Sequence, residues 1–426
     1  MIGAGLSLEQ APPFEATGRF FLSVPIFIIM AGLILVFKDL FLVRSDPSIV
    51  AFIHLFTLGV FTMVMFGAIG QMLPVLAGVS IPNTLMVSRL SHTFLIAGTL
   101  LFVYGFLSTM TPLISLISGM FLLTSFFLVL GTSLYALINT QKFSPTVKAI
   151  FTAMIAGLFT SFLGVWLLTS YAGKYSEVHA TIMSIHMVWG IFGFAGVLII
   201  GVSFKIIPMF YVAPEFKTFC TKWVVPLIVI GLILWSVFSF FLPELKWLAL
   251  LVIATFFFAF SVTVIKKLNQ GRRPISDVTI WYWKFAGVNL FIGMLVWIIY
   301  EFMSLNLDVY LAVCIGGGFI LSILTGMLYK IVPFLVWFHL NAKGHFEIPT
   351  MREMISAKIA KIQFVFHVLS LILVLGALSF PYLIQLAGLA FIISGILMMV
   401  NLLKAVRIYL KYKDIDPNVV FKTKEP

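Results

Sequence analysis

The chain of 426 residues is 62% hydrophobic and only 10% charged, and its mean hydropathy is +1.14. Soluble domains use about a quarter of their residues as charged groups, so this composition excludes a soluble protein and predicts an all-α integral membrane protein. The formal net charge of +12 comes from basic residues dispersed among loops, without the aromatic platforms of nucleic-acid binding, and predicts contact with anionic lipid headgroups but no nucleic-acid partner.

Hydrophobic runs follow one another along the whole chain with short polar breaks. Residues 1–18 lack the pattern of a cleavable signal, so the first span is expected to insert and stay. Backbone polar groups cannot remain unpaired in hydrocarbon, so the runs are predicted to be helices. The breaks at Thr111–Pro112 and Pro243–Glu244 are the narrowest. The twelve predicted spans are 19–37, 49–73, 87–109, 112–137, 148–171, 180–207, 223–242, 245–266, 279–301, 309–336, 359–379 and 381–406.

Basic residues are concentrated on one side of this topology. One set of loops and the C-terminal tail contain Arg89, Lys142, Lys148, Lys217, Lys222, Lys266, Lys267, Arg272, Arg273, Lys343, Arg352, Lys358, Lys404, Arg407, Lys411 and Lys413. The other set contains only Lys38, Arg44, Lys174 and Lys246. The positive-inside rule therefore predicts a multi-pass protein of a bacterial or archaeal cytoplasmic (inner) membrane with both termini in the cytoplasm. Cys220 and Cys314 fall on opposite sides, which excludes a disulfide between them.

A long-period repeat marks spans 2, 6 and 10. Each ends with Gly, three residues, Gln or Lys, two aliphatic residues and Pro, and has a second Gly eight residues before the first. The copies are Gly67–Pro74, Gly201–Pro208 and Gly326–Pro333, with the earlier glycines at Gly59, Gly193 and Gly318. The pattern predicts one domain of three parallel four-helix repeats, approximately 1–140, 141–275 and 276–426. Spans 2, 6 and 10 should line the inner ring of a pseudo-threefold bundle, with glycines that allow close helix contact and prolines that end or kink the helix.

Histidine inside a membrane span is uncommon and suggests a functional site. His54 lies in the outer part of span 2, and His186 lies in the outer part of span 6, although their registers relative to the repeated glycine differ by two residues. For both, a cofactor or metal ligand and a structural histidine are open interpretations. His92 and His367, in spans 3 and 11, are further candidate cofactor ligands for which a structural role is favoured.

This arrangement resembles subunit I of the haem-copper oxidases, which has twelve helices, three four-helix units and cytoplasmic termini. In that family helix 2 carries an axial ligand of a low-spin haem and helix 6 carries a copper ligand. The resemblance therefore implies that His54 binds a haem, expected to be b-type, and that His186 binds a metal, with copper as a second cofactor. The stretches from His54 to Pro74, from His186 to Phe210 and from Gly326 to His339 are also similar to short oxidase-subunit-I-like proteins. The NnrS family, which is linked to nitric-oxide stress, has a similar architecture.

The sequence also departs from the oxidase pattern. Span 10 reads DVYLAVCIGGGFILSILTG and has no histidine, and neither does span 7, although the family has histidines in both regions. We therefore expect no complete binuclear centre. The function expected from the resemblance is a haem-binding membrane protein that handles electrons or a small gas such as nitric oxide. The alternatives are a non-catalytic subunit or assembly factor of a respiratory or denitrification complex, and a transporter of haem or a small apolar solute.

Overall fold

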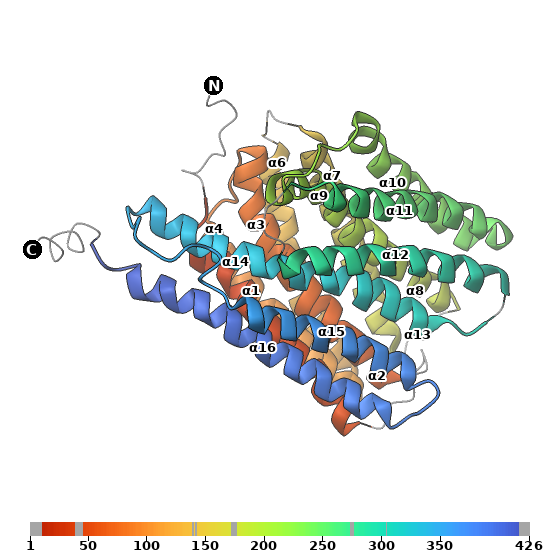
Figure 1. The fold of residues 1–426 in the computed structure, drawn as a ribbon. Coiled ribbons are helices and arrows are strands. Elements are labelled where there is room, and N and C mark those ends of the chain that lie inside the picture. The colour runs from red at the N-terminus through yellow and green to blue at the C-terminus, as the bar shows by residue number, and fades with distance from the viewer. Residues whose placement is uncertain are drawn as a thin grey trace, which may run out of the picture.

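The computed structural model describes residues 11–38, 46–138, 140, 143–171, 177–272, 277–303 and 305–416. Twelve helices in these residues are long and apolar enough to cross a membrane, and no strand occurs among them (Figure 1). The chain therefore has the makeup of a multi-pass helical membrane protein, as predicted. In order, the spans are α1 (Phe14–Phe37), α2–η2–α3 (Pro47–Ala77), α4 (Thr84–Leu107), α5–η3–α6 (Pro112–Ile138), α7 (Pro145–Tyr171), α8–η4–α9 (His179–Tyr211), α10 (Thr218–Phe241), η5–α11 (Pro243–Asn269), α12 (Val278–Met303), α13–η6–α14 (Asp308–Ala342), α15 (Ala357–Gly376) and α16 (Leu383–Tyr412).

Both narrow breaks between predicted spans are present. The Thr111 hydroxyl accepts a hydrogen bond from the backbone N–H of Ile114 at 3.2 Å, and Pro112 occupies the first turn of α5, so this pair starts a new helix. The 3₁₀ turn Pro243–Leu245 separates α10 from α11. Cys220 and Cys314 are both free thiols, as expected.

Several helices extend beyond the predicted apolar runs. The basic residues Lys404, Arg407 and Lys411, expected in a tail, belong to the last turns of α16, which ends at Tyr412. The repeated prolines were expected to end or kink their helices. Pro333 lies inside α14, which continues to Ala342, so this proline does not end its helix. Hydropathy detects only the part of a helix that matches the hydrocarbon layer, and these helices continue into the interface.

The first and last spans, α1 and α16, lie side by side (Figure 1). The Phe14 ring at the start of α1 lies 4.3 Å, centroid to centroid, from the Tyr409 ring near the end of α16. The described ends of the chain are thus at the same end of the bundle, as an even number of spans requires. Among the basic residues used for orientation, Arg44, Lys142, Lys174 and Arg273 lie outside the described residues.

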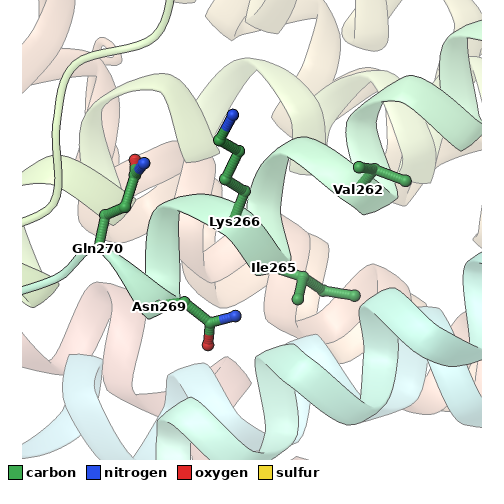
Figure 2. A pocket seen from close by; sticks show the side chains of 5 residues that line it. All are labelled: Val262, Ile265, Lys266, Asn269 and Gln270. Atoms are coloured by element: carbon green, nitrogen blue, oxygen red, sulfur yellow. The ribbon is translucent and has the colours of Figure 1, made fainter.

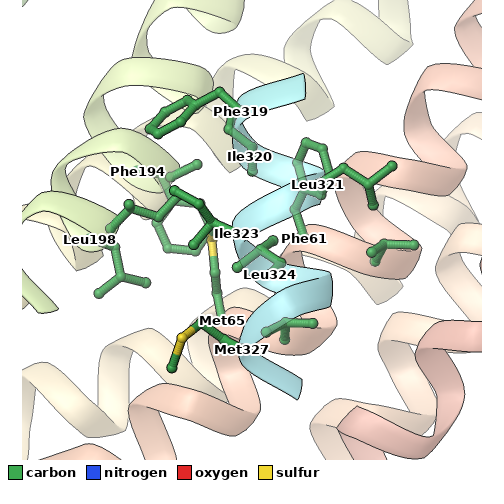
Figure 3. Close-up of a cluster of buried hydrophobic side chains, with 14 of the residues drawn as sticks. Phe61, Met65, Phe194, Leu198, Phe319, Ile320, Leu321, Ile323, Leu324 and Met327 are labelled. Carbon is green, nitrogen blue, oxygen red and sulfur yellow. The ribbon is translucent and has the colours of Figure 1, made fainter. Parts of the chain in front are cut away.

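Spans 2, 6 and 10 lie inside the bundle, as the repeat predicts. The buried share of the most apolar stretch is 61%, 72% and 78% in these spans, against 33–44% in all others except α1, which has 61%. Their side chains meet in one apolar cluster (Figure 3). The second span contributes Phe61 and Met65, the sixth Phe194 and Leu198, and the tenth a run that includes Phe319.

The repeated glycines are the contact points between the first and second helix of each unit. A Cβ atom added at any of the six would meet a side chain of the preceding span. The side chains are Phe27 and Phe21 of α1 for Gly59 and Gly67, Ala156 and Ala149 of α7 for Gly193 and Gly201, and Asn289 and Tyr282 of α12 for Gly318 and Gly326. Only glycine allows this approach, so the predicted role of these residues in close helix packing is confirmed.

A π-helical segment interrupts each of the three inner spans. The segments are η2 (Thr57–Thr62), η4 (Trp189–Gly196) and η6 (Ala312–Leu321), and η2 and η4 both contact η6. The Thr62 hydroxyl donates to the Thr57 carbonyl at 2.8 Å, five residues back, and the Ser322 hydroxyl donates in the same way to Gly317 at 3.1 Å. Side chains thereby satisfy carbonyls in the widened turns. π-Helical segments are rare and are frequently found at functional sites.

Candidate functional site

His54 and His186 occupy equivalent positions at the start of two π-helical segments. His54 is in α2 (Pro47–Phe56), three residues before η2 begins, and His186 is in α8 (His179–Val188), three residues before η4 begins. The segment η2 has six residues and η4 has eight. The two histidines therefore stand at the same distance from the start of their π-helical segments, although their distances to the repeated glycines differ by two residues.

The Nδ1 atom of each imidazole is held by a backbone carbonyl. His54 Nδ1 lies 2.8 Å from the carbonyl of Val50, one turn back in α2, and His186 Nδ1 lies 3.0 Å from the carbonyl of Thr160 in α7. A carbonyl only accepts, so each Nδ1 carries the proton and each Nε2 of the neutral ring has a free lone pair. No hydrogen bond from the described residues reaches either Nε2 atom. Histidines that bind metals are oriented in this way.

The two rings, one from the second span and one from the sixth, lie close together and nearly parallel. Their centroids are 6.4 Å apart and their planes differ by 18°. With metal–nitrogen bonds of about 2 Å, an ion held in line by both Nε2 atoms places the two ring centroids about 6 Å apart. The observed separation leaves room for one ion between the rings, and binding by both Nε2 atoms requires each ring to present its Nε2 edge to that ion.

Residues from two further spans surround the pair. The Phe102 ring of α4 lies 4.5 Å from the His54 ring, centroid to centroid. On α7, Gly164 lies against the other imidazole, since a Cβ added there would be 3.0 Å from His186 Cε1. The Thr160 hydroxyl, one turn from Gly164, is buried without a hydrogen-bond partner. The surroundings are thus apolar apart from the two Nε2 atoms and one unpaired hydroxyl.

The number of ligands limits which metal the pair can hold. Among the described residues no cluster of three or more His, Cys, Asp or Glu side chains has the geometry of a metal site. Zinc takes four ligands, whereas a haem iron takes four from its porphyrin and only one or two from the protein. Two neutral imidazoles with free Nε2 atoms in an apolar setting therefore fit the axial positions of a haem iron.

His92 is not part of this pair. Its Nε2 atom lies 2.8 Å from the hydroxyl of Ser23 on α1, and its ring packs edge-on against Phe20 at 5.2 Å. The Ser23 hydroxyl donates its proton to the Arg19 carbonyl at 3.0 Å, so it accepts from His92 Nε2–H. The contacts favour the structural interpretation of His92, which joins α4 to α1.

His367 has the same kind of partner, a serine hydroxyl on the tenth span. Its Nε2 atom lies 2.7 Å from the hydroxyl of Ser322, and that hydroxyl donates to the Gly317 carbonyl of η6. Only 2% of the residue is exposed. His367 therefore donates a hydrogen bond from α15 to the widened turn of the tenth span, and these contacts too favour a structural role.

A second buried polar cluster, which the sequence did not indicate, ties α15 to its neighbours. The Gln363 side-chain carbonyl accepts from the hydroxyls of Tyr282 and Tyr329, and its amide donates to the Ser394 hydroxyl at 2.7 Å. All four residues are buried. Every polar group of Gln363 thus has a partner, so the cluster holds four spans together and has no group free for a ligand.

Comparison of the chain with protein-family models and with curated proteins finds no match, so any assignment of function depends on the geometry of the site.

Proposed function

We propose that the chain is a haem-binding membrane protein in which His54 and His186 would together hold one haem iron. The observation that carries the proposal is the pairing itself: near-parallel rings 6.4 Å apart, each with Nδ1 bound to a carbonyl. The sequence resemblance assigned the two histidines to different metals, a haem and copper. The geometry favours a single shared iron, because no further ligand among the described residues completes a separate copper site.

Two axial imidazoles favour electron transfer over gas binding. A haem held by both histidines would supply one-electron redox chemistry, with both residues occupied as ligands. The carbonyls of Val50 and Thr160 fix the ring orientations and make the two Nε2 atoms better donors. The Phe102 ring lies beside the His54 ring, 4.5 Å from it between centroids. The proposed function is therefore electron transfer, in preference to the handling of nitric oxide.

The proposed relationship to haem-copper oxidase subunit I extends to the architecture. Three parallel four-helix units related by a pseudo-threefold axis agree with the matching glycine contacts and with a π-helical segment in each inner span. The residue three positions before η6 is Val309, so the third unit has no imidazole at the matching position. Cytoplasmic termini remain our proposal on the distribution of charge.

The proposal is tested by optical spectra of the purified protein, oxidised and reduced. We expect a Soret band and, on reduction, the sharp visible bands of a low-spin haem. His54→Ala and His186→Ala should each remove this low-spin signature, because each removes one of the two ligands. His92→Ala and His367→Ala are the matched controls, since their Nε2 atoms bind serine hydroxyls, and both should keep the spectrum of the wild type.

Two results would overturn the proposal. Purified protein reconstituted with haem that shows no Soret band rules out a haem protein altogether. A low-spin spectrum that survives in either His54→Ala or His186→Ala refutes the shared iron.

A further inference from the structure

A shallow depression lies at the end of α11, far from the histidine pair in the sequence and formed by other residues (Figure 2). Its volume is about 460 Å³. The lining residues follow one another along one face of the last turns of the helix, at the spacing of three and four residues that a helical face requires. They are Val262, Ile265, Lys266, Asn269 and Gln270.

The lining changes from apolar to polar along the helix axis. Val262 and Ile265 lie deeper in the span, whereas Lys266, Asn269 and Gln270 lie in the last turn of the helix and just beyond it. A phospholipid has the same order of chemistry, with an acyl chain followed by a phosphate and a polar headgroup. The depression therefore matches a lipid molecule standing parallel to the helix, with its phosphate level with Lys266.

Positive charge gathers at the polar end. Lys266 is exposed, while the neighbouring Lys267 is buried and donates to the carbonyls of Pro214 at 3.0 Å and Glu215 at 2.7 Å. Lys217 and Lys266 are both close enough to Lys267 to repel its ammonium group. Because Lys267 is occupied by backbone carbonyls, Lys266 is the lysine of this helix end that is available to an anion.

The neighbouring helix keeps the apolar wall in place. Ile265 packs against Gly287 of α12, where an added Cβ would lie 2.9 Å from Ile265 Cγ1. Figure 2 shows that the Ile265 and Lys266 side chains leave α11 in different directions. The positive-inside rule places this end of α11 at the cytoplasmic leaflet, where anionic lipids are abundant.

We propose that this depression binds one anionic phospholipid, with the acyl chain against Val262 and Ile265 and the phosphate at Lys266. Asn269 and Gln270 donate their side-chain amides to the headgroup oxygens. The site is independent of the haem, so it holds whether or not the function proposed above is correct.

The test is native mass spectrometry of the detergent-purified full chain, titrated with phosphatidylglycerol or with phosphatidylcholine of the same acyl chains. The tightest phosphatidylglycerol-binding event should weaken about fivefold in Lys266→Gln, as expected for loss of one lysine at a membrane surface. Lys266→Arg should bind as the wild type does. The matched control is Lys404→Gln, which removes an exposed lysine from α16 and should leave this event unchanged.

Unchanged phosphatidylglycerol affinity in Lys266→Gln overturns the proposal. So does equal affinity for phosphatidylcholine, which would mean that the apolar surface binds any lipid. Displacement of the lipid by millimolar inorganic phosphate would assign the lysine to a free anion and would also refute a lipid site. A thermal unfolding midpoint equal to that of the wild type shows that each variant is folded. An optical spectrum equal to that of the wild type shows that a change in lipid binding is not caused by a change in haem binding.

Discussion

Replacing Gly164 by valine tests whether the position of the His186 ring matters for the histidine pair. A Cβ at residue 164 would lie 3.0 Å from His186 Cε1 and 3.5 Å from Nδ1, and valine adds two methyl groups beyond that. Carbon atoms in good contact are about 3.5–4.0 Å apart, so the ring has to move by about 0.5–1 Å. The variant therefore displaces the imidazole without removing it.

The expected size of the effect follows from the bond that orients this ring. The Nδ1 atom of His186 lies 3.0 Å from the Thr160 carbonyl, and a displacement of about 0.5 Å or more brings this bond to the limit of hydrogen bonding, about 3.5 Å. Loss of such an outer partner lowers metal affinity by about 10- to 100-fold. We expect the haem affinity of Gly164→Val to fall within this range and that of Gly164→Ala to fall less.

Haem affinity is measured by titrating haem into the haem-free protein and following the Soret band. Gly119→Ala is the matched control, because a Cβ at Gly119 would meet Val165 at an ordinary distance of 3.4 Å. Thermal unfolding of the haem-free proteins shows whether each variant is folded. If Gly164→Val folds and binds haem as tightly as the wild type, the His186 ring is not a ligand held by Thr160, and the reasoning fails.

Two further predictions concern the stability of the bundle. Gly201→Val should lower the free energy of unfolding by about 1–3 kcal/mol or more, because the valine side chain would overlap Ala149 of the preceding span. Gly119→Ala should leave it nearly unchanged in the same detergent unfolding assay. Gln363→Leu should cost about 1–3 kcal/mol for each hydroxyl left unpaired, on Tyr282 and Tyr329, and therefore more than removal of one hydroxyl in Tyr329→Phe. Equal unfolding midpoints for these last two variants would contradict the assigned network.

The positions of the spans could be predicted because hydrocarbon leaves the backbone no alternative to a helix. The run 309–336 became Asp308–Ala342, and 112–137 became Pro112–Ile138. The errors lie at the polar ends, where a helix continues after its hydropathy signal stops. The inner position of spans 2, 6 and 10 was also predictable. The same pair of glycines recurs on every fourth span, and glycines so placed indicate a helix with close neighbours.

The serine partners of His92 and His367 were not predictable, although both histidines were expected to be structural. Ser23 is separated from His92 by the rest of α1 and a complete further span, and Ser322 lies on a different span from His367. A hydrogen bond between helices depends on how each helix is rotated about its axis. Hydropathy gives no measure of that rotation where both faces of a helix are apolar.

The pairing of His54 with His186 was not predictable either, because it too depends on how the helices are rotated about their axes. Counted from the repeated glycines, the two histidines differ by two residues, which on regular helices turns one side chain about 200° away from the other. The longer segment η4 takes up these two residues in its widened turns, so the count from the start of each π-helical segment is three in both units. The same count in the tenth span reaches Val309, an aliphatic side chain. Sequence spacing gives no measure of where the helices widen, so it could not show that the two histidines lie close together. Their assignment to two separate metals came from the resemblance to the oxidases.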